Sequence, residues 1–334
     1  LPLLLASSAG LAQTVRCVDS MLEFDQAWAL LDDEPVEIRM VAGEYDLTGS
    51  CIDADEIERE SCDADDDFRL SGGWNAGCTL QDHTPGATTL LLPGGSVRIN
   101  PSGEFEGAGD VHLSALTFRA IPGGFFFRSY DVGSDERGQF RVERVWFDQS
   151  GELTLNADAL ISSSLLSRAT DPCAIATGSA ALDLVHITVA DSVGDGLCMG
   201  RAQDDRDWRL TLINSILWNN GGYDIALRNA DGSGPEARIY QSTYATLLND
   251  PGGLLAELPV GTLASDPQFI DPAALDYELG ASASVNSGRI LASTLQQRDL
   301  RGDPRLYSFA PDRGALESPI GSTATQLVVT SVAD

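Results

Sequence analysis

The chain has 334 residues, with 50 acidic residues against 21 basic ones and a formal net charge of −29. It contains no lysine, so all of its 21 basic residues are arginines. Compositional bias alone would also explain this absence of lysine. A surface this negative repels nucleic acid and anionic lipid, because affinity for nucleic acid depends on cations that meet phosphates. The missing lysine excludes Schiff-base chemistry and P-loop nucleotide binding. We therefore expect no nucleic-acid partner.

Residues 1–12 resemble the end of a secretory signal peptide. An apolar run, Leu1 to Leu5, is followed by small residues and then by Gly10-Leu11-Ala12, after which cleavage is expected. A short buried strand is the alternative interpretation. No other stretch is apolar enough to span a membrane. The sequence thus predicts a secreted or cell-surface protein with no membrane-spanning segment.

The six cysteines favour disulfides over a metal site. None forms a CxxC pair and only three histidines are present, which argues against zinc. Disulfides suit an exported chain. We expect Cys173–Cys198, because a separation of 25 residues is about one coil of the fold described below. The other four leave several connectivities open, and our working assignment is Cys51–Cys62 and Cys17–Cys78.

One helix and one strand are predicted near the start of the chain. Ser20 and Glu23 have the spacing of a capping box, and apolar residues continue to about Asp32. A strand follows at Val36–Val41. We interpret the helix as a cap over the first coil, because the open edge of a sheet needs cover.

An acidic, irregular stretch follows at 52–68. Six of its aspartates could supply oxygen ligands to Ca²⁺: Asp53, Asp55, Asp63, Asp65, Asp66 and Asp67. The glycine and terminal glutamate of an EF-hand loop are missing. A solvated charge run is the alternative.

A weak repeat runs from about residue 88 to 250. Short stretches of alternating apolar residues surround a small or polar corner. We take one inward position to be equivalent in six coils: Leu116, Val145, Leu165, Ile187, Ile216 and Thr243. The steps between them range from 20 residues (Val145 to Leu165) to 29 residues (Leu116 to Val145). Strands this short gain a core only by stacking. The pattern predicts an all-β fold, a right-handed parallel β-helix (a solenoid) over 13–317 with a short N-terminal capping helix. An antiparallel β-sandwich is the competing interpretation.

Residues 262–317 carry a series of motifs in a specific order and spacing. They are Asp266-Pro267-Gln268-Phe269, Asp276-Tyr277-Glu278-Leu279, Ser284-Val285-Asn286-Ser287-Gly288, Asp299-Leu300-Arg301-Gly302-Asp303-Pro304-Arg305 and Pro311-Asp312-Arg313-Gly314-Ala315-Leu316-Glu317. This part resembles the C-terminal part of the choice-of-anchor Q domain of exported bacterial β-helix proteins. The segments at 42–47 and 70–78 are similar to motifs of the same proteins. The resemblance implies a bacterial protein that is exported, and it carries no catalytic residues to transfer. Residues 318–334 are expected to form a tail or the start of a further segment.

Catalytic patterns are weak. Gln203-Asp204-Asp205 looks like the paired aspartates of polygalacturonases, but the other motifs of those enzymes are missing, and an exposed charged turn is the alternative. A calcium-dependent lyase could use acids and an arginine on one side of the rod, for which the candidates are Asp191, Asp195, Arg201, Asp204 and Asp205. His112 and His186 are interpreted as stacked polar residues on a strand face.

We therefore expect a non-catalytic protein that binds glycans or mediates adhesion, with a polysaccharide-lyase-like enzyme as the alternative. Exposed aromatic side chains could stack on neutral sugars. The candidates are Trp74, Trp208 and Tyr223, for which buried packing is the competing role. No cofactor other than calcium is expected.

Overall fold

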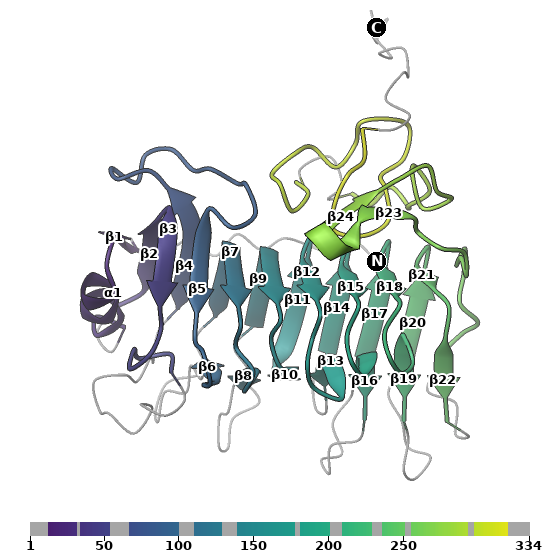
Figure 1. The fold of residues 1–334 in the computed structure, drawn as a ribbon, viewed down its shortest axis with the longest axis horizontal. Helices are drawn as coiled ribbons and strands as arrows, with labels where there is room; N and C mark the ends of the chain where they lie inside the picture. Colours follow the sequence, from purple (N-terminus) through teal and green to yellow (C-terminus); the bar gives the residue numbers. More distant parts are fainter. Residues whose placement is uncertain are drawn as a thin grey trace, which may run out of the picture.

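The structure, a computed structural model, describes residues 13–31, 34–53, 67–99, 110–128, 139–177, 181–200, 209–228, 236–250, 255–292 and 297–319. Within these ranges the chain is mainly β, and its strands stack into a parallel solenoid (Figure 1). No helix of this part is long and apolar enough to cross a membrane.

The strands of the solenoid form three faces. The first face consists of β1 (Thr14–Val18), β2 (Val36–Val41), β4 (Phe68–Trp74), the start of β7 (Val111–Arg119), the start of β9 (Gln139–Asp148), β11 (Asp158–Ser162), β14 (Ala181–Val185), β17 (Arg209–Ile213) and β20 (Glu236–Tyr240). The second face consists of β3 (Gly43–Asp46), β5 (Thr88–Leu91), the ends of β7 and β9, β12 (Leu165–Ser167), β15 (Thr188–Ala190), β18 (Ile216–Trp218) and β21 (Thr243–Tyr244). The third face consists of β6 (Val97–Ile99), β8 (Phe125–Arg128), β10 (Leu153–Asn156), β13 (Cys173–Thr177), β16 (Asp195–Met199), β19 (Ile225–Leu227) and β22 (Leu247–Asn249). From β4 onward, each coil contributes strands to all three faces, whereas β1 adds only to the first face and the coil of β2 and β3 to the first two.

Every ladder between strands of these three faces is parallel. Val111, for example, pairs with Phe68 of the preceding coil and with Phe140 of the next. A β-sandwich would pair its strands antiparallel, so that competing interpretation is wrong. The inward residues form one continuous apolar core along the stack, with ring pairs such as Phe118 on Phe147, whose centroids are 5.5 Å apart.

A left-handed residue turns the chain from the first face to the second in six coils. These corner residues are Ala115, Arg144, Ser163, His186, Asn214 and Gln241. The residue after each corner lies at the inner edge, and in three coils it is a serine. Ser164 Oγ accepts a hydrogen bond from Val145 N at 3.1 Å, and Ser215 Oγ accepts one from Ile187 N at 3.2 Å. The serine hydroxyls are therefore satisfied by the backbone of the preceding coil.

The positions of these corners show that part of the predicted inward register is wrong. Val145 and Ile187 belong to the inner core as expected. Leu165, Ile216 and Thr243 do not, because they lie one position further on, in an outward column that runs Trp146, Leu165, Thr188, Ile216, Thr243. Ile216 is nevertheless fully buried, because Gly314 of the C-terminal segment packs against it.

The helix α1 (Met21–Trp28) begins at Ser20, whose side chain accepts a hydrogen bond from Glu23 N at 3.4 Å. Glu23 in turn accepts one from Asp19 N, the residue before the cap, whereas a capping box would use Ser20 N; of the predicted box, the bond to the Ser20 side chain is present. The helix ends earlier than the predicted Asp32. It lies beside β1 and β2 at one end of the stack (Figure 1), and Trp28 packs edge-on against Phe68. The predicted strand at Val36–Val41 is β2.

The C-terminal segment (residues 264–292 and 297–319) lies over the second face rather than continuing the stack (Figure 1). It contains the antiparallel pair β23 (Phe269–Asp271) and β24 (Asp276–Leu279), joined by the 3-10 helix η3 (Pro272–Ala274). A second apolar cluster joins it to the outward column: Trp146, Leu165, Ala190, Tyr277, Leu300, Ala315 and Leu316.

The motif residues of this segment form its buried polar network. Arg305 is fully buried and donates hydrogen bonds to the carbonyl oxygens of Gly314 (2.9 Å) and Ala315 (2.8 Å) and to Glu317 Oε1 (3.2 Å). Burial raises the pKa of Glu317 to about 8, although the charge of Arg305 acts in the opposite direction. The motifs therefore account for how the segment folds and docks.

Two disulfides lie wholly within the described residues, Cys17–Cys78 and Cys173–Cys198, and both pairs are among those expected. Cys51 is also disulfide-bonded, and its expected partner, Cys62, lies outside the described residues.

Candidate functional site

A groove opens on the second face between the loop at 75–87 and the C-terminal segment. It encloses about 210 Å³. Its walls combine apolar, aromatic and charged side chains: Pro85, Trp146, Leu165, Leu275, Asp276, Tyr277, Leu300, Arg301 and Leu316. The two walls meet where Gly302 packs against the His83 ring, and Arg144 Nη1 of β9 lies 2.9 Å from His83 Nδ1 at the same point.

Trp146 forms the floor of this groove. It points outward from β9, between Thr117 and Leu165 of the neighbouring coils, and remains 8% exposed. The indole is fixed by a 2.9 Å hydrogen bond from Nε1 to Ser167 Oγ. The Arg119 guanidinium lies 5.8 Å from the centre of the ring. The ring is thus held in one orientation before any ligand arrives.

Charged groups occupy the wall contributed by β24 and the following loop. Arg301 pairs with Glu278 and lies 3.6 Å from Asp276. Burial lowers the pKa of Arg301, but the hydrogen bond and charge of Glu278 outweigh burial and leave it raised. Tyr277 donates a 2.9 Å hydrogen bond to Asp191 Oδ2, and burial together with that carboxylate raises the pKa of Tyr277.

Asp148 anchors the polar groups behind the groove. It is fully buried and accepts two hydrogen bonds from Arg168 Nη2, at 2.6 and 2.7 Å, as well as one from Ser167 Oγ. Arg119 Nε lies 3.3 Å from the same carboxylate. Among the residues that line the groove, one arginine (301) faces one carboxylate (276), which gives 1 − 1 = 0.

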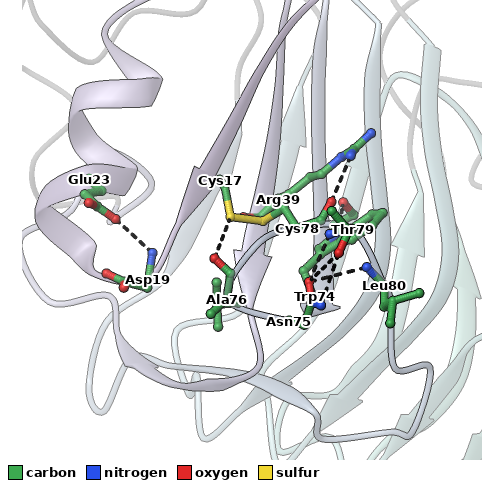
Figure 2. The surroundings of a disulfide bond; sticks show 12 residues. Cys17, Asp19, Glu23, Arg39, Trp74, Asn75, Ala76, Cys78, Thr79 and Leu80 are labelled. Carbon is green, nitrogen blue, oxygen red and sulfur yellow. Dashed lines mark hydrogen bonds between the residues drawn. A yellow bond between two sulfur atoms is a disulfide. The ribbon is translucent and has the colours of Figure 1, made fainter.

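The aromatic residues predicted to bind sugar lie elsewhere. Trp74 ends β4, where the Arg39 guanidinium covers its ring at 4.4 Å, beside the Cys17–Cys78 disulfide (Figure 2). Tyr223 is 41% exposed at the corner before β19. Trp208 lies outside the described residues.

The lyase candidates are not brought together by the described part of the chain. Asp191 binds Tyr277 and Asn219 over the second face. Asp195 begins β16 on the third face and pairs with Arg228 at 2.5 Å. Arg201, Asp204 and Asp205 lie outside the described residues. Asp195 also lies close to Cys173 and Cys198, but their sulfurs form a disulfide and offer no thiolate to a metal.

Two of the six predicted calcium ligands are described, and each has a partner in the protein. Asp53 is buried and accepts a hydrogen bond from Gly49 N. Asp67 accepts one from Asp110 N of the next coil, and Asp110 accepts one from Gln139 N of the coil after that. Asp67 therefore ties coils together. Asp55, Asp63, Asp65 and Asp66 lie outside the described residues.

The two histidines occupy different positions, contrary to the prediction. His112 points outward from the strand β7, as expected. His186 is a fully buried corner residue whose Nε2 lies 3.1 Å from Asn214 Nδ2, and burial lowers its pKa well below the usual range.

Sequence reasoning missed the groove, because Trp146 comes from a coil while Tyr277 and Arg301 come from motifs more than 100 residues later. The one available signal was the motif series itself, which contains Asp276-Tyr277 and Arg301. No protein-family model matches the chain, and searches of curated proteins and of solved structures returned no match.

Proposed function

We propose that this is an exported, non-catalytic protein of the bacterial cell surface or surroundings that binds glycans in the groove over Trp146. In this proposal the solenoid is a right-handed β-helix of the choice-of-anchor Q type, with α1 covering its first coil. Right-handed crossovers between parallel strands are the strong rule. The disulfides support export, since such bonds persist in oxidising compartments.

The observation that carries the proposal is the pairing of a fixed indole with an Arg301–Asp276 pair in one groove. The C–H face of a sugar ring packs against an aromatic ring, while guanidinium and carboxylate groups exchange hydrogen bonds with hydroxyls. Ligand pockets typically combine apolar walls with a few such polar groups.

The charge balance of the groove points to an uncharged sugar. A groove whose lining has no net charge, within a protein of −29, disfavours an anionic ligand. The arrangement also disfavours glycoside hydrolysis, which needs one carboxyl as an acid and one as a base or nucleophile. Both Asp276 and Glu278 are occupied by Arg301.

Tryptophan fluorescence tests the site. Titration with neutral oligosaccharides such as xylo-, manno- and cello-oligosaccharides should change the emission of the parent protein. The Trp146→Phe variant should lose that change, while Trp218→Phe, which alters an outward tryptophan of β18, should keep it.

Calorimetry with a second pair of variants tests the polar wall. Arg301→Met should weaken binding about tenfold or more, because a hydrogen bond to a charged group contributes about 1.5–3 kcal/mol. Arg209→Met, the same change in an exposed pair with Asp183, should bind as the parent does. If no neutral glycan binds the parent, or if both arginine variants bind equally well, the groove is not a glycan site.

A further inference from the structure

The first face carries a column of charged side chains that the groove does not use. The register places Glu37, Arg69, His112 and Arg141 opposite one another on four successive coils. All four occupy outward positions, which alternate with buried core residues such as Leu70 and Leu113. Neighbouring strands are about 4.8 Å apart, so Arg69 and Arg141 flank His112 at a separation of about 10 Å.

The two arginines of this column, Arg69 and Arg141, have no ion pair among the described residues. Both are exposed, whereas other arginines of the same face are paired, such as Arg209 with Asp183 and Arg238 with Glu236. His112 Nε2 is enclosed and has no hydrogen-bond partner in the described part of the chain. The nearest carboxylate oxygen, Glu143 Oε2, is 3.9 Å away.

The surroundings leave this strip balanced in charge. Arg39, Arg69, Arg141 and Arg144 contribute four positive charges, against four negative ones from Glu37, Asp67, Asp110 and Glu143, which gives 4 − 4 = 0. Glu37 is bound to Arg39 at 2.7 Å, and Glu143 lies 3.5 Å from Arg144. Figure 2 shows Arg39 beside Trp74 and Cys78. This balance stands out in a chain that carries −29 overall.

We propose that this arginine strip is a second binding site, which holds a carboxylated polysaccharide chain lying along the stacked coils. Guanidinium groups pair with carboxylates through two parallel hydrogen bonds, and this geometry favours arginine over a point charge. Two guanidinium groups on alternate coils, neither of them in an ion pair with a described residue, match a polymer that carries carboxylates at intervals. The open strand face suits an extended chain rather than a compact ligand.

The strip favours a carboxylated polysaccharide over nucleic acid. Nucleic acid gains its affinity from many phosphate contacts, and the two arginines Arg69 and Arg141 offer few. At physiological ionic strength, charges beyond about 8 Å are screened, so close arginine–carboxylate contacts can outweigh the distant acidic surface.

The strip is built for binding rather than cleavage. Burial, followed by the charges of Arg141, Arg69 and Arg144, lowers the pKa of His112 to about 4. The ring is therefore neutral near pH 7, and it is too weak a base to remove a sugar proton efficiently.

A charge-matched pair of double variants tests the site at an ionic strength of about 0.15 M. The probes are oligogalacturonate and oligomannuronate, with fully methyl-esterified oligogalacturonide as the uncharged counterpart. Arg69→Gln/Arg141→Gln should weaken oligouronate binding about tenfold or more. Arg209→Gln/Arg238→Gln removes the same charge from the far end of the same face and should change the affinity less than twofold.

Several results would overturn the proposal. They are no oligouronate binding by the parent, equal losses in both double variants, binding of the methyl ester as tight as that of the acid, or displacement of the oligouronate by single-stranded DNA of equal charge. Thermal melting of each variant checks that the exposed substitutions leave the fold intact. Arg301→Met should bind oligouronate normally, so failure of the groove and failure of the strip are separable.

Discussion

Replacement of Arg305 by methionine is expected to release the C-terminal segment while the coils remain folded. The guanidinium is fully buried, and its removal takes one hydrogen-bond donor from the Glu317 carboxyl group and one from each of the carbonyls of Gly314 and Ala315. Loss of the donor to a buried polar group costs about 1–3 kcal/mol, and three acceptors lose one here. A cost of about 4 kcal/mol raises the undocked fraction roughly a thousandfold, since each 1.4 kcal/mol is a factor of ten.

Hydrogen exchange is the appropriate assay because it reports each region separately. Amides of residues 297–319 should lose protection in the variant, whereas amides of β14 and β17 should keep theirs. The double variant Arg305→Met/Glu317→Met should recover part of the loss, because it also removes the buried carboxyl group that the guanidinium satisfied. Protection of residues 297–319 that is equal in Arg305→Met and the parent would refute the reasoning.

Three further predictions follow from the described contacts. Replacement of both Cys173 and Cys198 by serine should cost about 2–4 kcal/mol of unfolding free energy, measured by urea denaturation, and an unchanged midpoint would contradict this. The pKa of Glu317, about 8 in the folded protein against an ordinary 4.5, means that its protonation stabilises the docked segment. This contribution is complete below about pH 4.5 and is lost as the pH rises through about 8; melting of the parent should show this decline and Glu317→Gln should show less of it. Finally, no unsaturated product should accumulate, by ultraviolet absorbance, when uronate polymers are incubated with the protein and millimolar Ca²⁺; steady product abolished by changes at Arg201 or Asp204 would instead favour a lyase.

Local features of the fold were readable from the sequence. The N-cap at Ser20, the strand at Val36–Val41 and the one-coil separation of Cys173 and Cys198 each depend on residues close in the chain or on one repeat length. The alternation of apolar residues sufficed to predict parallel stacked coils.

The one-residue error at Leu165 and Ile216 has a physical origin. Both are apolar residues next to a serine, and the sequence alone favours burial of the aliphatic side chain. The serine takes the inner edge because a neighbouring backbone N–H satisfies it, and the aliphatic residue is buried from outside by the C-terminal segment. Repeat patterns cannot reveal such a covering segment, because it contacts the coils far from its own position in sequence.

The two proposed sites were hidden for a related reason. Arg69, His112 and Arg141 are separated by 43 and 29 residues, and only the lengths of the intervening loops bring them into one column. Trp146 meets Arg301 only because the last part of the chain folds back.

That return path changes how the rod should come apart. In a solenoid each coil contacts only its neighbours, so unfolding normally frays from an end, one repeat at a time. Here the C-terminal segment bonds to Ser163, Asn214, Ser242 and Gly261, on coils spread along half the stack. No terminal coil beneath it can open without breaking these lateral bonds. The later coils should therefore unfold as one cooperative unit. In folding, the segment can dock only after all of these coils have formed, so its docking is the last step of assembly.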